Sequence, residues 1–420
     1  MTTPGPATIP PARRRLLRWI ALAPPALIVG ALLGVLAYQL ARPLPAVAPV
    51  VVAATAQPLG APFAVPWPQS GEATLLVPGL GSMGSSGAVR SIPMASTAKV
   101  MTALIVLEDH PLAPGQPGAS LTVGPQDVAA YRRDVALDES SVPVTAGESL
   151  TELQLLEGLL IPSASNFADL LARWDAGSVD AFIAKMNQRA SQLGLTHTHY
   201  ADASGFSPLT VSIPQDLVEV ARRAMMQPVF AGIVSMPSAT LPVAGTVRST
   251  DALLSEGLVV GIKTGHTNQA GGNFVFAADM VVDGGLPVRV FGAVMGQPSL
   301  NAAFDATRTL VRTVTPHLHY RIVVHKLDPL ATYTAPWQAR ATARASDFLQ
   351  FLYADGMTLQ RGIEVRPITP PTPDETAIGT LSVTVGEQRR QLPVVLGQPL
   401  AGPGLRWRLT RSLAQPSAGG

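Results

Sequence analysis

The first strong feature of the chain is an apolar run near its N-terminus. Trp19 to Leu40 comprises 22 residues without a charged side chain. A helix of that length is about 33 Å long, enough to cross a bilayer. Four arginines between positions 13 and 18 lie directly before it, which places that end in the cytoplasm and the rest of the chain outside. The pattern predicts a cytoplasmic tail at 1–18 and a single-pass anchor in the cell membrane at 19–41.

A cleaved signal peptide is the alternative to an anchor. Ala46-Val47-Ala48 and Ala54-Thr55-Ala56 have the small-residue spacing that signal peptidases prefer. The apolar run is long for a signal peptide, which favours the anchor. Both hypotheses make the rest of the chain extracytoplasmic. Residues 42–70, which are rich in Ala, Pro and Val and contain no acidic residue, are expected to form an extended linker.

From about residue 71 to 315 the apolar pattern predicts one mixed domain. Expected strands lie at 73–77, 258–262, 273–282 and 286–295, with a hairpin turn at 283–284 and a Gly/Ser-rich turn at 79–87. Expected helices lie at 96–107, 149–160, 168–174, 179–193, 215–226 and 301–314, and the second begins with a Ser149 to Glu152 capping box. The fold class is therefore α/β (α+β), with helices around an at least partly antiparallel sheet.

The character of the chain changes after residue 316. Short β-like runs at 320–324, 380–385 and 390–396 predict a small β-rich C-terminal domain over 316–411. Residues 412–420 are expected to form a flexible tail.

Composition and charge narrow the functional classes. The 420 residues include no cysteine, which excludes cysteine peptidases, zinc fingers and disulfide scaffolds. The net charge of +2 comes from five arginines that precede the first acidic residue, Glu72, and the remainder is slightly acidic. No basic face interleaved with aromatic residues follows, so we expect no nucleic-acid partner. Only four of the basic residues are lysines.

Ser96-Thr97-Ala98-Lys99 is the first candidate for chemistry. Residues three apart share a helix face, so the Ser96 hydroxyl and the Lys99 amine can come within hydrogen-bond distance. A lysine desolvated by apolar neighbours can take the proton of a serine nucleophile, which an arginine cannot do. The alternative without a catalytic role is a solvent-facing lysine one turn after a serine.

Two further segments carry polar side chains that suit a peptide substrate. Lys263-Thr264-Gly265 follows an expected strand, where a cation, a hydroxyl and a close backbone approach suit an extended peptide with a carboxylate. Pro162-Ser163-Ala164-Ser165-Asn166 follows an expected helix, where serine and asparagine can relay a proton and hold an amide. Each segment alone also fits an ordinary turn.

The histidine pairs give no comparable signal. His197-x-His199 and His317-x-His319 lack a further ligand at metal-site spacing, so they are expected to be structural or surface residues. No P-loop, dinucleotide fingerprint or HExxH motif occurs. We therefore expect neither a metal nor a cofactor.

In their order along the chain, the three motifs resemble those of the serine penicillin-recognising enzymes, which pair Ser-x-x-Lys with Ser-x-Asn and Lys-Thr-Gly. More narrowly the chain resembles the low-molecular-mass penicillin-binding proteins, the D-alanyl-D-alanine carboxypeptidases, over residues 70–315. The similarity extends to Gly147-Glu148, Met186-Asn187, Leu193-Gly194-Leu195, Ala203-Ser204-Gly205 and Gly261 to Thr267. It implies a β-lactamase/DD-peptidase-like fold with a helical subdomain.

The resemblance also implies residue roles. Ser96 is the acylated nucleophile, Lys99 its base, and Ser163 part of the proton relay. Lys263, Thr264 and Gly265 bind the substrate, and the amides of Ser96 and His266 form the oxyanion hole. The chain departs from the family in two places. Ser165 occupies the third position of Ser-x-Asn, with Asn166 one step on, and Ser249-Thr250-Asp251 replaces an Asn-x-Asn segment. The first departure puts the binding of the substrate amide by Ser165 and Asn166 in doubt.

The resemblance implies a carboxypeptidase that removes D-alanine from peptidoglycan stem peptides and is inhibited by β-lactam antibiotics. A β-lactamase is one alternative, although no glutamate lies between Glu157 and Glu219 to serve as the deacylating base of class A enzymes. A scaffold of the same fold that binds cell-wall peptide without hydrolysis is the other. A scaffold has no need of a serine–lysine pair, which favours the enzyme.

Overall fold

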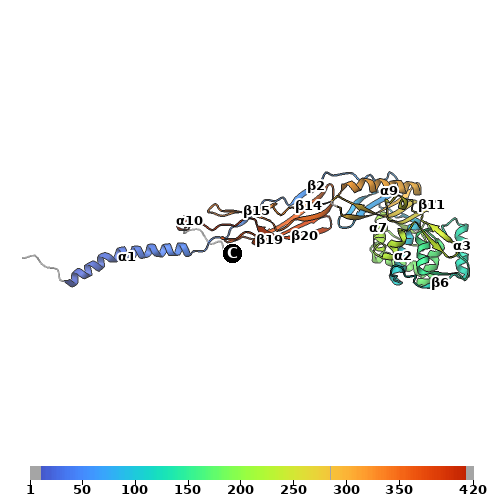
Figure 1. Cartoon of the computed structure of the whole chain (residues 1–420), viewed down its shortest axis with the longest axis horizontal. Helices are drawn as coiled ribbons and strands as arrows, with labels where there is room; N and C mark the ends of the chain where they lie inside the picture. Colours follow the sequence, from blue (N-terminus) through green and yellow to red (C-terminus); the bar gives the residue numbers. More distant parts are fainter. Residues whose placement is uncertain (1–10, 284, 413–420) are drawn as a thin grey trace, which may run out of the picture.

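The protein is elongated in its computed structural model, which describes residues 11–283 and 285–412, with side chains from residue 24 onward (Figure 1). The long helix α1 (Pro11–Ala41) forms one end, a β-rich part the middle, and a part of helices packed on a sheet the other end. The tails beyond these residues, and position 284 in the expected hairpin turn, lie outside the described residues.

A five-stranded antiparallel sheet organises the part that carries the three motifs. Its order is β11 (Ile262–Thr267), β12 (Gly271–Val281), β13 (Pro287–Gln297), β3 (Glu72–Val77) and β4 (Gly81–Ser86). Alternate residues of β12 are buried on opposite faces, Val275 and Ala277 on one and Phe274 and Phe276 on the other. Helix α7 (Pro214–Ala224) packs on the first face and α9 (Leu300–Val314) on the second. The near-continuous apolar runs of β12 and β13 follow from this double coverage.

The other helices pack around α2 (Lys99–Asp109). This helix is apolar on all sides and buried from Lys99 to Leu107, as expected of a central helix. Its neighbours include α4 (Glu152–Leu160), α5 (Ser165–Ala176), α6 (Val179–Gln192), α7 and α8 (Pro228–Val234), and α3 (Pro125–Ala136) packs on α5. Short strand pairs complete this part: β5 (Ile92–Pro93) with β8 (Val211–Ser212), β6 (Ser120–Thr122) with β7 (Ser149–Thr151), and β9 (Ser238–Leu241) with β10 (Gly245–Arg248).

The β-rich part has a core of its own. Its seven-stranded antiparallel sheet has the order β1 (Pro49–Val51), β15 (Pro329–Thr334), β16 (Arg340–Ala345), β20 (Gln388–Leu396), β19 (Ala377–Val385), β18 (Met357–Val365) and β2 (Ala56–Leu59). A second pair joins β14 (Leu318–Val324) to β17 (Leu349–Ala354). Four of these strands, β15 to β18, were not predicted from the sequence.

The segment 42–70 differs from the extended linker that its composition predicts. Strand β1 pairs with β15, and β2 pairs with β18, so the segment supplies both outer strands of the β-rich sheet. Their partners lie roughly 300 residues away in the sequence, and no local pattern signals such pairing.

Three further expectations were wrong in detail. The Gly/Ser-rich stretch forms the edge strand β4 instead of a turn, and β11 begins at Ile262 where the predicted strand ended. The capping box of α4 pairs Thr151 with Gln154 and not Ser149 with Glu152.

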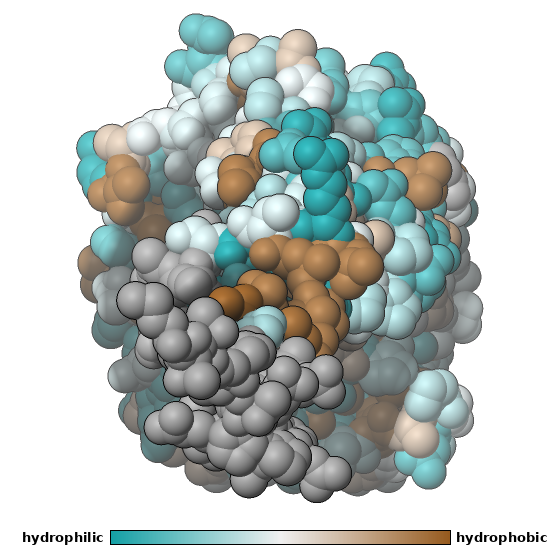
Figure 2. Space-filling model, turned by 90° about the vertical axis from the view of Figure 1, so that its left-hand side faces the viewer, coloured by the Kyte–Doolittle hydropathy of each residue, from teal (hydrophilic) through white to brown (hydrophobic). Residues whose placement is uncertain are grey.

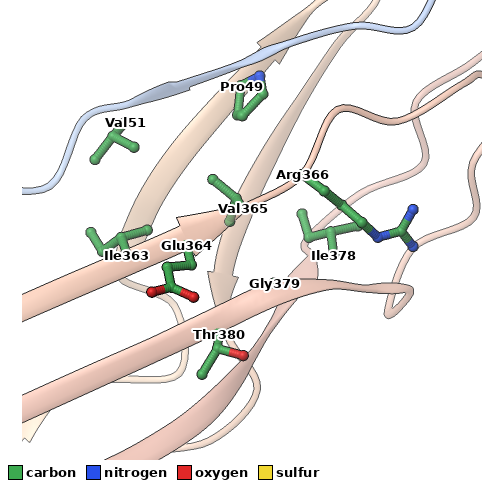
Figure 3. A pocket seen from close by; sticks show the side chains of 9 residues that line it. All are labelled: Pro49, Val51, Ile363, Glu364, Val365, Arg366, Ile378, Gly379 and Thr380. Carbon is green, nitrogen blue, oxygen red and sulfur yellow. The ribbon is translucent and has the colours of Figure 1, made fainter. Parts of the chain in front are cut away.

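A cavity of about 620 Å³ lies in the β-rich part and is lined by residues of β1, β18 and β19 (Figure 3). Aliphatic side chains such as Val51, Ile363 and Ile378 line it together with Glu364 and Arg366. It lies outside the part that carries the three motifs.

The C-terminal end of the described chain lies beside the end of α1. Arg411 follows the short helix α10 (Leu405–Thr410), and its guanidinium donates to the carbonyls of Gln39, Arg42 and Pro43 at 2.7–3.0 Å. The negative end of the helix dipole also stabilises a cation at these carbonyls. Figure 2 shows apolar side chains gathered at this end of the molecule next to hydrophilic ones.

The packing of α4 on α5 makes a stability prediction. A Cβ at Gly158 in α4 would overlap the ring of Phe167, which is buried. We expect Gly158→Ala to lower the free energy of unfolding by about 1–3 kcal/mol through overpacking. Gly232→Ala in α8, where the added Cβ meets nothing within 4 Å, is the matched control. Urea unfolding of both variants checks this, and equal stability of the two would contradict it.

Candidate active site

Ser96 lies in a tight turn that packs closely against the backbone at Gly205 and at Gly265. The 3₁₀ turn Ala95–Ala98 leads directly into α2, and Ala95 before the serine has a positive φ of 49°, a region that costs energy for a residue with a Cβ. A Cβ at Gly205 would overlap the Ala95 carbonyl, and one at Gly265 would lie 3.0 Å from the Ser96 amide nitrogen. Both glycines therefore allow the close packing that holds the serine in place.

The Lys99 amine is buried next to the Ser96 hydroxyl. Its Nζ lies 2.8 Å from Ser96 Oγ and 3.2 Å from Ser165 Oγ, and it donates to the Ser204 carbonyl at 3.0 Å. Burial lowers the pKa of Lys99 to about 8, and the negative charges of Asp202 and Glu139 limit the drop. A neutral amine has two hydrogens and one lone pair. When Ser165 and Ser204 accept the hydrogens, the lone pair faces the Ser96 hydroxyl.

A second buried lysine lies on the neighbouring strand β11. Lys263 is 1% exposed, and its Nζ donates to the Thr264 carbonyl at 3.1 Å. Burial lowers the pKa of Lys263 well below its usual value, and the nearby charge of Lys99 lowers it further. The segment Ser249-Thr250-Asp251, which departs from the family pattern, lies next to Thr264 of the same strand. Thr250 Oγ1 is 2.5 Å from Thr264 Oγ1, and burial raises the pKa of Asp251 to about 6.

The structure separates the polar residues of the second motif. Ser165, the first residue of α5, contacts Lys99, whereas the buried Ser163 hydroxyl has no hydrogen-bond partner among the described residues. Ser163 has a positive φ of 73°. Asn166 lies away from the lysine, because its amide group pairs with both backbone groups of Val142, at 2.9 and 3.0 Å. The hydroxyl of this motif that contacts Lys99 is thus that of Ser165.

Strand β11 lies beside the turn that carries Ser96. His266 lies in this strand opposite Gly272 with an exposed side chain, directly after Gly265. Strand β11 is the edge of its sheet, so one side of its backbone pairs with β12 and the other is free of a strand partner among the described residues.

Three polar residues that the sequence analysis missed shape the site. Asp202 accepts hydrogen bonds from the amides of Gly205 and Ser207 and thereby fixes the loop whose Ser204 carbonyl contacts Lys99. Asn273 joins Pro93 to Gly296 through its side-chain amide. Glu139, in the loop after α3, lies near the Ser165 hydroxyl and Lys99. Asp202 precedes Ala203-Ser204-Gly205, which was a usable signal, whereas nothing local marks Glu139.

The histidine pair at 317 and 319 lies elsewhere. His317 pairs with Asp355 at 2.8 Å, and His319 pairs with Asp355 and Asp283 at 3.1 and 3.0 Å. In the parts of the chain that the structure describes, no group of three His, Asp or Glu side chains is arranged to hold a metal ion.

The fold and the Ser96–Lys99 pair define a serine-type hydrolase with the penicillin-binding fold. A sequence profile described as D-alanyl-D-alanine carboxypeptidase matches residues 85–299, about half of the chain. The chain belongs to this peptidase family.

Curated relatives agree with this assignment. The chain is 37% identical to D-alanyl-D-alanine carboxypeptidase DacB2 of Mycobacterium tuberculosis over 44% of this chain and 62% of that protein. It is 32% identical to a D-alanyl-D-alanine carboxypeptidase of Streptomyces sp. strain K15 over 51% of this chain and 76% of that protein. It is 29% identical to a D-alanyl-D-alanine endopeptidase of Haemophilus influenzae over 52% and 70%. The match to the mycobacterial protein thus spans less than two thirds of that protein.

Solved structures agree as well. The Streptomyces K15 DD-transpeptidase matches with a TM-score of 0.51 and 28% identity, over 60% of this chain and 98% of that chain. Penicillin-binding protein 5 from Haemophilus influenzae matches with a TM-score of 0.57 over 81% of this chain and 99% of that chain. At 17% identity the latter is a likeness of fold alone.

The lowered pKa of Lys99 makes a prediction about pH. A general base must be neutral, so we expect the rate of penicillin acylation to rise as the pH increases through about 8 and then to level off. Lys99→Arg keeps a charge at every accessible pH and should lose about 10²–10⁴-fold in rate. Stopped-flow acylation with a fluorescent penicillin from pH 6 to 10 measures both. A rate that Lys99→Arg recovers at high pH would contradict this role.

Proposed function

We propose that the protein is a serine DD-carboxypeptidase that removes the terminal D-alanine from peptidoglycan stem peptides. The observation that carries the proposal is the buried amine of Lys99, 2.8 Å from the partly exposed Ser96 hydroxyl. This pairing supplies a nucleophile with its base already in position. The names of the curated relatives support the choice of D-alanyl-D-alanine as the bond attacked.

Substrate binding uses the edge of β11. The terminal carboxylate of the peptide binds Lys263, Thr264 and Gly265, where a buried cation has no carboxylate of its own within salt-bridge distance among the described residues. The peptide lies extended along the free side of β11, as peptides do at exposed sheet edges. The amides of Ser96 and His266 stabilise the oxyanion, a role in which preorganised donors are most effective.

The reaction proceeds through an acyl-enzyme. Ser96 Oγ attacks the carbonyl carbon between the two D-alanines while its proton moves to neutral Lys99. The C–N bond breaks, Lys99 returns the proton to the leaving amine, and D-alanine departs. Water then attacks the ester carbonyl, Lys99 takes one proton of the water, and that proton returns to Ser96. β-Lactams acylate the same serine, because their amide presents the same carbonyl.

An endopeptidase that cuts cross-linked peptides is the second candidate. It uses the same residues on a larger leaving group, and the matched relatives include proteins with that name. The β-lactamase and scaffold alternatives have no such support among these relatives.

The acyl-enzyme makes the decisive prediction. We expect the wild-type protein to release D-alanine from a D-Ala-D-Ala peptide and to show a penicillin adduct by intact mass. Ser96→Ala should lose both, and Lys185→Ala, on the surface of α6, should lose neither. Adding a cross-linked dimer peptide separates carboxypeptidase from endopeptidase. Rapid turnover of benzylpenicillin without D-alanine release would instead identify a β-lactamase.

We also propose that the protein is a single-pass membrane protein with its active site outside the cell. Residues 71–315 form the catalytic domain, and 316–411, with the strands of the linker, form the β domain. One described helix is long and apolar enough to cross a bilayer, over Pro24–Ala41, and arginines precede the apolar run. The slightly acidic remainder gives no reason for a nucleic-acid partner.

The anchor predicts a distinct fractionation. We expect the full chain to sediment with membranes and to resist extraction by high salt and carbonate, because a spanning helix is held by apolar burial. A chain that begins at residue 43 behind a cleavable signal peptide should be soluble. Protease protection of an N-terminal tag tests the orientation. Release of the full chain by salt, or cleavage of the wild-type chain near Ala48 or Ala56, would contradict the anchor.

A further inference from the structure

The loop after α3 brings a carboxylate to the catalytic lysine from outside the three motifs. Helix α3 ends at Ala136, and Asp138 has a positive φ of 58°. The Asp138 amide donates to the Val135 carbonyl at 3.2 Å, and the Glu139 amide donates to the Asp134 carbonyl at 2.8 Å. These two bonds form a Schellman motif, which fixes the direction of the chain as it leaves the helix.

The loop is also attached to the N-terminus of α5. The Ser165 amide donates to the Ser140 carbonyl at 2.8 Å, next to Glu139. The half-buried Glu139 side chain lies next to the Ser165 hydroxyl, which acts to lower the pKa of its carboxyl group. Ser165 in turn lies 3.2 Å from Lys99 Nζ, which lies 2.8 Å from Ser96 Oγ. Ser165, Lys99 and Ser96 therefore form a continuous row of polar contacts, and Glu139 lies next to its Ser165 end.

We propose that Glu139 is a positioning residue that fixes the direction of the proton transfer from Ser96 to Lys99. The inference rests on the proposed acyl-transfer function. A serine hydroxyl can rotate and can either donate to an amine or accept from it. When the Glu139 carboxylate accepts the Ser165 hydrogen, the Ser165 oxygen accepts from Lys99. The Lys99 lone pair is then left for the Ser96 proton. Glu139 acts through Ser165 and does not touch the reacting atoms.

Protonation of Glu139 removes this constraint, since a carboxylic acid can itself donate to Ser165. Burial raises the pKa of Glu139 to about 7. Its contact with Ser165 and the charge of Lys99 act against the rise. The charged and titratable groups around the Glu139–Lys99 pair are Asp134 and Arg133 of α3, Asp169 of α5, Asp202 and Lys263. Two groups thus titrate close to neutral pH, Lys99 as the base and Glu139 as the group that orients Ser165.

The wild-type pH profile of penicillin acylation tests this without any variant. Below pH 7 both Lys99 and Glu139 are protonated, so the logarithm of the rate should fall with a slope that exceeds one near pH 7 and returns to one at lower pH. A slope of one throughout would overturn the proposal. Absence of acylation at every pH would instead contradict the proposed function itself, so the two failures are distinguishable.

The variants separate orientation from charge. Glu139→Gln should lower the plateau rate at high pH by about tenfold, less than the ~10²-fold or more for loss of a general base, and restore a slope of one. Asp169→Asn is the matched control, because it also removes a negative charge that acts on Lys99 but does not contact Ser165. It should shift the midpoint to lower pH and leave the plateau unchanged. A similar result for Glu139→Gln would reduce its role to charge alone and overturn the proposal.

Ser165 provides the coupling test. Ser165→Ala should lower the plateau about as much as Glu139→Gln, and the double variant should fall no further. Ser165→Asn keeps an acceptor for Lys99 and a donor for Glu139, so it should retain most of the rate. Penicillin affinity before acylation and thermal unfolding are measured alongside, since misfolding changes both. Additive losses in the double variant would show that Glu139 does not act through Ser165.

Discussion

The burial of one lysine amine is the constraint on which the active site depends. A charged ammonium loses much of its hydration when buried, so the site must either supply oxygen partners or make the amine give up its proton. Lys99 has three oxygen partners, two from hydroxyls and one from the Ser204 carbonyl. Each partner comes from a different element, namely the nucleophile turn, the start of α5 and the loop fixed by Asp202. The packing of these elements around α2 therefore sets the protonation of the base.

The proposed reaction requires opposite charge states of the two buried lysines, a charged Lys263 and a neutral Lys99. The charge of Lys99 helps to lower the pKa of Lys263, so in the absence of an anion the two disfavour each other's charged form. In the proposed function, a substrate carboxylate at Lys263 provides the missing counter-charge on the β11 side. The contacts of Lys99 are to the oxygens of Ser96, Ser165 and Ser204. The geometry thus favours a charged Lys263 and a neutral Lys99 in the same complex, which suits an anionic peptide and a general base.

The sequence was informative where the chemistry is local. Ser96 and Lys99 meet because three-residue spacing places them on one face of a helical turn, and the β12–β13 hairpin follows from two apolar runs. The sequence could not show which of Ser163 and Ser165 contacts Lys99, because this depends on the positive φ of Ser163 and on where α5 begins. Glu139 was not readable either, since a Schellman turn at a non-glycine residue directs it to a site 40 positions from Lys99. Pairing of β1 and β2 across roughly 300 residues has no local signature.

This long-range pairing changes how the catalytic part is connected to α1. A flexible linker of 42–70 would let the catalytic part move freely relative to the helix. Instead, β1 and β2 are hydrogen-bonded into the β-rich sheet, and Arg411 from the far end of the same part binds the carbonyls that end α1. The residues directly after α1 and those near the C-terminus therefore hold the same helix end from two sides. The catalytic part is reached only through a folded sheet with its own core, so its distance from α1 is set by strand length and not by the statistics of a flexible chain.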